Sequence, residues 1–148
     1  MRRDDGGNAI IEFIFVALIV MVPLVYLIAA VAVVQRDRTA VAQAARNAGR
    51  AFATSDTAVQ GRVRVSAAVR LALHDQGLPN DAHVRFVAAG AQCSDPPVAP
   101  RLAAGTVFTV CVTRRVQLPA IPSVLAGRGI TTVGVYVVHV DDFRTVDR

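Results

Sequence analysis

Hydrophobic positions divide the chain into one long apolar run near its start and shorter periodic segments after it. The run from Phe13 to Val34 contains 22 residues and no charged side chain. As a helix it would measure about 33 Å, enough to cross a hydrocarbon core of about 30 Å. Residues 8–34 are therefore predicted to form a transmembrane helix. Pro23 lies within it, as a kink of the kind that membrane helices tolerate.

The helical pattern continues beyond the membrane run, as an alanine-rich amphipathic segment that reaches about Thr54. Its apolar residues recur at i, i+4, i+7 and i+11 and form one stripe, made of Val41, Ala45, Ala48 and Phe52. The pattern predicts one long helix, half in lipid and half outside it. The outer half could pack against neighbouring helices or lie on its own domain.

A second helix is predicted from Ser55-Asp56 to about Gln76. Its apolar residues repeat every four positions, at Val59, Val63, Ala67 and Leu71. Gly77 is typical of the residue that follows a helix end, and Pro79 prevents the helix from continuing.

The apolar period then changes to two, which predicts strands over 82–88, 106–118 and 130–141. In the second strand Phe108, Val110 and Val112 face one way, while Thr109, Cys111 and Thr113 face the other. The third is apolar on both faces, which suits a central strand or one whose second face is covered by a partner. The predicted fold class is α+β, with the helices laid on a three-stranded antiparallel sheet. Residues 35–148 would form this one domain.

The charge of the domain is strongly positive. Residues 35–148 hold fourteen arginines, eight aspartates and no lysine, a formal charge of +6. A nucleic-acid surface would need arginines clustered on one face, ideally with stacking aromatic residues. Here the arginines are spread over every predicted element, and only 5% of residues are aromatic. Nucleic acid is therefore not the expected partner, although a DNA-capturing subunit stays an alternative.

No pattern of catalytic residues is present. The three histidines, His74, His83 and His139, are scattered over a helix and two strands without a carboxylate spacing that suggests metal ligands or a triad. Neither a phosphate-binding loop nor a hydrolase nucleophile motif occurs in the sequence. We expect no enzymatic activity, small-molecule substrate, cofactor or metal.

Glu12 stands at the start of the apolar run and is the only glutamate in the chain. A carboxylate at the mouth of a membrane helix is costly and therefore a candidate for function. Gly7, then four residues, then Glu12 and an apolar helix: this order resembles the class III signal of type IV prepilins. The resemblance implies that a prepilin peptidase cuts after Gly7. Residues 1–7 would then be a leader, Asn8 the new amino terminus and Glu12 the fifth mature residue.

Physical chemistry agrees with that resemblance. The new amine on Asn8 and the carboxylate of Glu12 are one helical turn apart, and buried charges persist in lipid by pairing. In a bundle of subunits, Glu12 could neutralise the terminus of a neighbour and set the axial register. Glu12, Phe13 and Pro23 are accordingly the residues expected to take part in subunit assembly.

Other interpretations of the amino-terminal segment stay open. Glu12 could be an interfacial charge on an uncleaved single-pass scaffold protein. Alternatively, the segment could be a secretory signal peptide cut after Ala32, although its apolar region exceeds the usual 7–15 residues. Arginines on the carboxyl-terminal flank, from Arg36 to Arg50, favour a cytoplasmic domain by the positive-inside rule. The prepilin signal requires the opposite orientation, and we give it more weight.

Two cysteines, Cys93 and Cys111, cannot supply a four-ligand zinc site unaided. Outside the cytoplasm, the economical interpretation is one disulfide that pins the proline-rich loop to the sheet. The alternative is a buried free Cys111 with an unrelated surface Cys93.

A wider resemblance covers most of the chain. Three segments, QAARNAGRAFA, FTVCVTRRVQLPAIPSVL and VYVVHVDDFR, resemble TadE-like pilins, the minor pilins of the tight-adherence (Tad) pilus. One departure is the Asp4-Asp5 pair, where such leaders usually keep a plain positive charge. The resemblance implies a minor pilin or pseudopilin in the cytoplasmic membrane, with its domain outside. Expected partners are other pilin subunits, the Tad assembly machinery and the prepilin peptidase.

Overall fold

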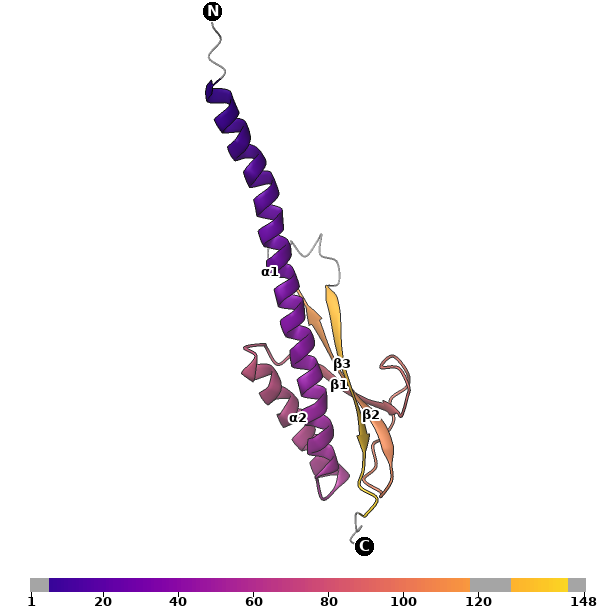
Figure 1. Cartoon of the computed structure of the whole chain (residues 1–148). Helices are drawn as coiled ribbons and strands as arrows, with labels where there is room; N and C mark the ends of the chain where they lie inside the picture. Colours follow the sequence, from indigo (N-terminus) through magenta and orange to yellow (C-terminus); the bar gives the residue numbers. More distant parts are fainter. Residues whose placement is uncertain (1–5, 118–128, 144–148) are drawn as a thin grey trace, which may run out of the picture. The chain divides into compact units, whose positions relative to one another are not determined.

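The computed structural model describes residues 6–117 and 129–143, and the chain forms two compact units, residues 1–33 and 34–148. The elements follow in the order α1 (Gly6–Ala53), α2 (Ala58–Asp75), β1 (His83–Ala88), β2 (Val107–Val116) and β3 (Ile130–His139) (Figure 1). One helix, α1, thus contains both the apolar run and the alanine-rich segment. This is the predicted α+β arrangement of a long helix, a second helix and three antiparallel strands.

The alanine-rich half of α1 packs against the sheet through the predicted stripe, because Val41, Ala45, Ala48 and Phe52 are all fully buried. Small residues allow a close approach between helix and sheet. A Cβ on Gly134 of β3 would collide with the backbone carbonyl of Val41. Only glycine lets the strand backbone lie this near the helix.

Both ends of α2 are capped. Thr57 is the N-cap residue, and its side chain accepts a hydrogen bond from the backbone N–H of Gln60. The helix therefore begins just after the predicted start at Ser55-Asp56. At the other end Gly77 has a φ of 64° and donates to the carbonyl of His74, while Leu78 donates to Leu73. These two bonds form a Schellman motif, so the predicted stop at Gly77 is confirmed.

The apolar residues that repeat every four positions in α2 do not form its buried face. Val59, Val63 and Leu71 are 71%, 66% and 61% exposed. The buried face is the opposite one, made of Gly61, Val65, Val69, Ala72 and Leu73. The two stripes are offset by two residues, or about 200° around a helix, and both are apolar. The choice between them follows from Phe52, whose ring fills the space that a Cβ on Gly61 would need.

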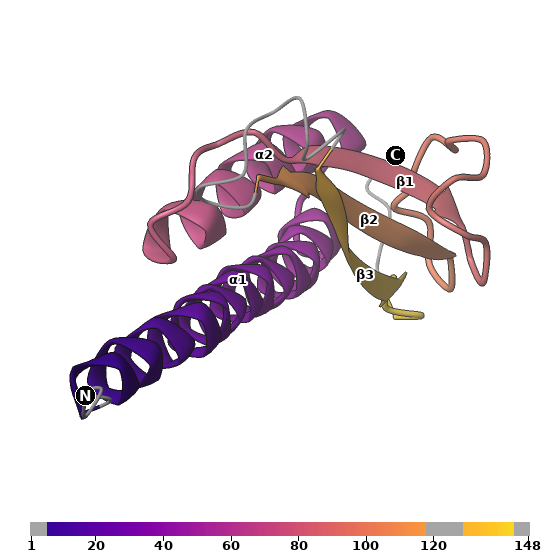
Figure 2. The ribbon, with the colours of Figure 1, turned by 90° about the horizontal axis from the view of Figure 1, so that it is seen from above.

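The sheet has the strand order β1-β2-β3, and both pairings are antiparallel (Figure 2). In the register, Phe86 pairs with Val110, and Val110 pairs with Tyr136. The central strand is therefore β2, and β3 lies at an edge of the described sheet. Of the two explanations offered for the apolar second face of β3, the central position in the sheet is therefore wrong. Coverage by a partner stays a prediction.

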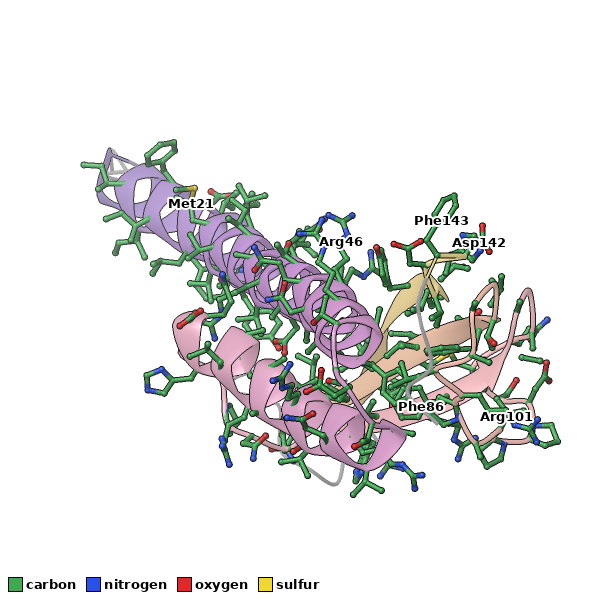
Figure 3. All side chains as sticks on the ribbon, turned by 90° about the horizontal axis from the view of Figure 1, so that it is seen from below. Met21, Arg46, Phe86, Arg101, Asp142 and Phe143 are labelled. Carbon is green, nitrogen blue, oxygen red and sulfur yellow. A yellow bond between two sulfur atoms is a disulfide. The ribbon has the colours of Figure 1, made fainter. Side chains whose placement is uncertain are left out.

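The core lies between the helices and one face of the sheet. Phe108, Val110 and Val112 of β2 are buried there, as their alternation predicts. Phe52, Phe86 and Phe108 form an aromatic group with ring centroids 5.3 to 5.9 Å apart. Such tilted and edge-on pairs add to the stabilisation from burial. Phe86 lies on the helix-facing side of β1 (Figure 3).

Candidate assembly site

The first half of α1 exposes apolar side chains all round, Met21 among them (Figure 3). Sixteen large hydrophobic side chains between Ile10 and Val31 are each at least 47% exposed. Among the described residues, α1 alone is long and apolar enough to cross a membrane, with a mean hydropathy of 3.0 over its most apolar window. These properties are compatible with a single-pass membrane protein.

The predicted processing and assembly residues lie on this one helix. Gly7 and Asn8 are in the first turn of α1, where backbone N–H groups have no helical partner. Glu12 follows Asn8 by one turn and is exposed, as is Phe13 at 74%. The helix continues past Pro23 without a break. Of the predicted leader, residues 1–5 lie outside the described part of the chain.

A cluster of three charges, two of them buried, joins α1 to the sheet. Arg114 of β2 is 8% exposed and donates from Nη1 to the buried carboxylate of Asp37 on α1. Its Nε donates to Asp81, which precedes β1, at 2.5 Å. Burial lowers the pKa of Arg114, and the positive charge of Arg36 lowers it further. The guanidinium still remains charged at neutral pH and so needs its two carboxylate partners.

Sequence reasoning missed this cluster, although a signal for it exists. Arg114 occupies the same face of β2 as Phe108, Val110 and Val112. An arginine on a face that points into the core requires an acidic partner. The strand pattern could therefore have predicted the need for a carboxylate. It could not have selected Asp37 from ten aspartates.

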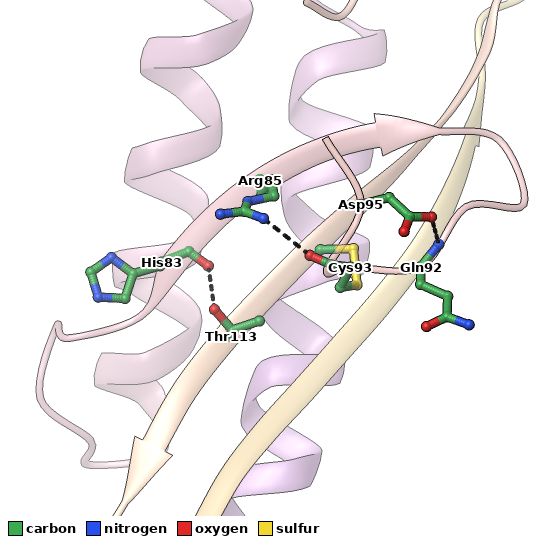
Figure 4. Close-up of a disulfide and its surroundings, with 7 residues drawn as sticks. His83, Arg85, Gln92, Cys93, Asp95 and Thr113 are labelled. Carbon is green, nitrogen blue, oxygen red and sulfur yellow. Dashed lines mark hydrogen bonds between the residues drawn. A yellow bond between two sulfur atoms is a disulfide. The ribbon is translucent and has the colours of Figure 1, made fainter. Parts of the chain in front are cut away.

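Cys93 and Cys111 form a disulfide, with their Cα atoms 5.7 Å apart (Figure 4). The bond holds the loop after β1 against the outer face of β2, where Cys111 is fully buried. Two further contacts fix this loop: Val98 donates to the Phe86 carbonyl at 2.8 Å, and Gln92 donates to Asp95 Oδ2 at 2.8 Å. The alternative of two free thiols is thus excluded in this structure.

A second exposed apolar surface lies on β3. Val133, Val135 and Val137 are 46%, 53% and 54% exposed, on the face of the strand that points away from α1. We call these three residues the β3 valine face. An edge strand with an apolar face is a typical site of association with another chain.

In the described part of the chain, no histidine belongs to a cluster that would suit a metal. Among the described residues, no group of three His, Cys, Asp or Glu side chains lies in a geometry that could hold a metal ion. His139 Nε2 lies 3.5 Å from Asp142 Oδ1, and both side chains are exposed.

Comparisons of the chain with protein-family models, with curated proteins and with solved structures found no match.

Proposed function

We propose that this protein is a minor pilin or pseudopilin of the TadE-like kind. It is inserted in the cytoplasmic membrane through the apolar half of α1 and released from its leader by a prepilin peptidase that cuts after Gly7. The mature amino-terminal helix then packs with those of other subunits, in or beneath a Tad pilus. The domain formed by residues 34–148 faces outward and performs no catalysis.

One observation supports this proposal best: a single helix carries the Gly7–Asn8 bond, Glu12 one turn later, and an apolar surface that no described residue covers. A lone carboxylate beside such a surface is costly in lipid unless a positive charge lies near it. Cleavage after Gly7 creates that charge, on the amine of Asn8. The amine of a neighbouring subunit is an equally suitable partner, which is how Glu12 would govern assembly.

Two links hold the elements of the outer domain together. Arg114 links β2 to Asp37 on α1, and the Cys93–Cys111 bond closes the outer face of the sheet. The β3 valine face is exposed on the same sheet and offers an apolar contact for another subunit. A cross-linked domain with one exposed apolar strand face suits an initiating, capping or adaptor subunit.

The deciding experiment is amino-terminal sequencing of the protein extracted from membranes of its native host. We expect a start at Asn8, and an uncut chain when Gly7 is replaced by valine. A start at Met1 would reject processing and leave Glu12 as an interfacial charge. A start after Ala32 would indicate a secreted soluble domain and reject the filament role altogether.

A second candidate is an uncleaved single-pass membrane scaffold. The arginines that follow the apolar run, among them Arg36 and Arg38, favour it because the positive-inside rule would place the domain in the cytoplasm. The disulfide argues against this orientation, since such bonds persist in oxidising compartments. Accessibility of an engineered cysteine at Ser66 to a membrane-impermeant thiol reagent in whole cells would distinguish the two orientations.

A further inference from the structure

The sheet carries a groove of about 650 Å³, lined by charged and polar residues, that the proposed assembly role does not use. Its walls include His83 and Arg85 from β1, Thr113 and Arg115 from β2, and Thr131 from β3. The volume lies within the range of about 300–1,000 Å³ that is typical of ligand sites. We call these five residues the groove residues.

Strand register explains why the groove residues meet. His83 pairs with Thr113, and Arg115 pairs with Thr131. All five lie on the face opposite the core, because side chains alternate along a strand and Phe86 and Val112 point inward. Figure 4 shows His83, Arg85 and Thr113 gathered on this face beside the disulfide. Arginines that are distant in sequence therefore share one surface.

The positive charge in the groove is largely uncompensated. Asp81 is the one carboxylate among the described wall residues, and it is engaged by Arg114 at 2.5 Å. Within the described chain, neither Arg85 nor Arg115 forms an ion pair. Arg85 donates only to the backbone carbonyl of Cys93, at 3.4 Å. Two exposed guanidinium groups are thus free to bind an anion.

We propose that the groove binds a phosphate group carried by a non-aromatic molecule. The Thr113 hydroxyl already donates to the His83 carbonyl at 3.5 Å. Two guanidinium forks, the Thr131 hydroxyl and an imidazole still provide more donors than the two oxygens of a carboxylate can accept. A glycerol phosphodiester adds two ester oxygens and the neighbouring hydroxyls to its two anionic oxygens, and arginine binds the phosphate in a bidentate manner. The described walls contain no Phe, Tyr or Trp on which a nucleobase could stack, which disfavours single-stranded nucleic acid.

The groove is larger than one phosphate group, so the bound molecule has a carbon framework beside it. A phosphodiester with glycerol on either side fits this description. Such a group occurs both in soluble polymers and in lipid headgroups, and the experiment must separate the two sources. This proposal goes beyond the assembly role and depends on none of its steps.

The test uses the full chain in uncharged maltoside micelles, with glycerophosphoglycerol as the soluble probe. Binding is followed by the NMR shifts of the groove residues. We expect saturable shifts at these residues, and about a tenfold or greater loss of affinity in an R85Q/R115Q variant, since charge-assisted hydrogen bonds are lost. The matched control is R62Q/R70Q, which removes the same charge from the exposed surface of α2 and should bind as the parent does.

A conservative variant separates geometry from charge. R85K/R115K keeps both charges but lacks the planar fork, so its affinity should fall between those of the parent and R85Q/R115Q. Equal binding by R85Q/R115Q and R62Q/R70Q would overturn the proposal. Polyglutamate bound as tightly as the phosphodiester would overturn it too, because the groove would then be a carboxylate site.

To decide the source of the phosphate, the NMR shifts of the groove residues are compared in two kinds of nanodisc. One is made of pure phosphatidylcholine, and the other contains one quarter phosphatidylglycerol. A soluble polymer is supported if glycerophosphoglycerol binds in solution and the groove residues have the same NMR shifts in both kinds of nanodisc. Groove shifts confined to the phosphatidylglycerol discs support a lipid headgroup. Absence of shifts with either probe rejects the proposal, whatever the outcome for cleavage at Gly7.

Discussion

Arg114 of β2 donates a hydrogen bond to Asp37 of α1, although 77 residues separate them along the chain. Both side chains are almost entirely buried, and Asp81 completes the cluster from the segment before β1. A buried ion pair adds little net stability over apolar residues, but it is very sensitive to the loss of one partner. Its main effect here is to fix the position of the sheet along the second half of α1.

Replacing Asp37 by alanine should lower the free energy of unfolding by about 3–5 kcal/mol, because Arg114 would stay buried with one carboxylate instead of two. Thermal or denaturant unfolding of the full chain in micelles, followed by circular dichroism, measures this change. Asp75→Ala, which removes an exposed aspartate from α2, is the matched control and should be nearly neutral. Adding Arg114→Met to Asp37→Ala should recover most of the lost stability. Equal stability of the Asp37→Ala and Asp75→Ala variants would refute the role of the cluster.

Gly134→Ala should destabilise the domain by about 1–3 kcal/mol or more, because the new methyl group meets the Val41 carbonyl and forces β3 away from α1. The same unfolding assay reports the change. Thr131→Ala on the exposed face of the same strand serves as the control and should cost much less. A neutral Gly134→Ala variant would show that helix and strand are not in such close contact.

Loss of the disulfide should destabilise the domain by about 3 kcal/mol, the chain-entropy value for a loop of this size. The bond joins residues 18 positions apart. A Cys93→Ala/Cys111→Ala variant should also be cut faster by trypsin after Arg101, which is exposed in the tethered loop. Reduction of the parent protein should reproduce both effects. Two free thiols in non-reducing mass spectrometry of the native protein would contradict the bond.

Thr109→Val should raise the free energy of unfolding by about 1 kcal/mol. The hydroxyl of Thr109 is buried and has no hydrogen-bond partner among the described residues, so its removal relieves a desolvation cost. Thr132→Val is the matched control on the neighbouring strand. Its hydroxyl donates to the Arg114 carbonyl at 3.3 Å, and the same substitution should therefore destabilise. Effects of equal sign would contradict this account.

Glu12→Ala should leave membrane insertion intact and stop assembly. The substitution makes the helix more apolar, so insertion is not impaired, whereas the partner of the Asn8 amine is lost. Carbonate extraction of membranes measures insertion, and electron microscopy of cells measures pili. Glu12→Asp, which keeps the charge on a shorter side chain, should retain part of the assembly. Normal piliation of the Glu12→Ala strain would remove the assembly role of this residue.

Much of the fold could be predicted from local pattern. The stripe from Val41 to Phe52 has a helical period and is buried, and the stop at Gly77 follows from its left-handed conformation. The alternation in β2 placed Phe108, Val110 and Val112 on one face, and that face lies in the core. Each of these features is encoded within a few residues, by spacing or by backbone preference. Glu12 and Gly7 likewise stand out from the sequence alone.

The local sequence pattern could not predict features that depend on what packs against a helix or strand. Both faces of α2 are apolar enough to be buried, and the ring of Phe52 packed against Gly61 decides between them. The apolar pattern of β3 is typical of a central strand, yet β3 lies at an edge of the described sheet because β2 pairs with β1 on its other side.

The sequence by itself determined the apolar helix, the order of the elements and the residues with unusual chemistry, since these are properties of short stretches. Only the tertiary structure selected Asp37 and Asp81 as the partners of Arg114, and only the strand register gathered His83, Arg85 and Arg115 into one groove. The physical reason is that charge pairing and groove formation depend on distances in space. Antiparallel pairing sets those distances between residues that are far apart along the chain.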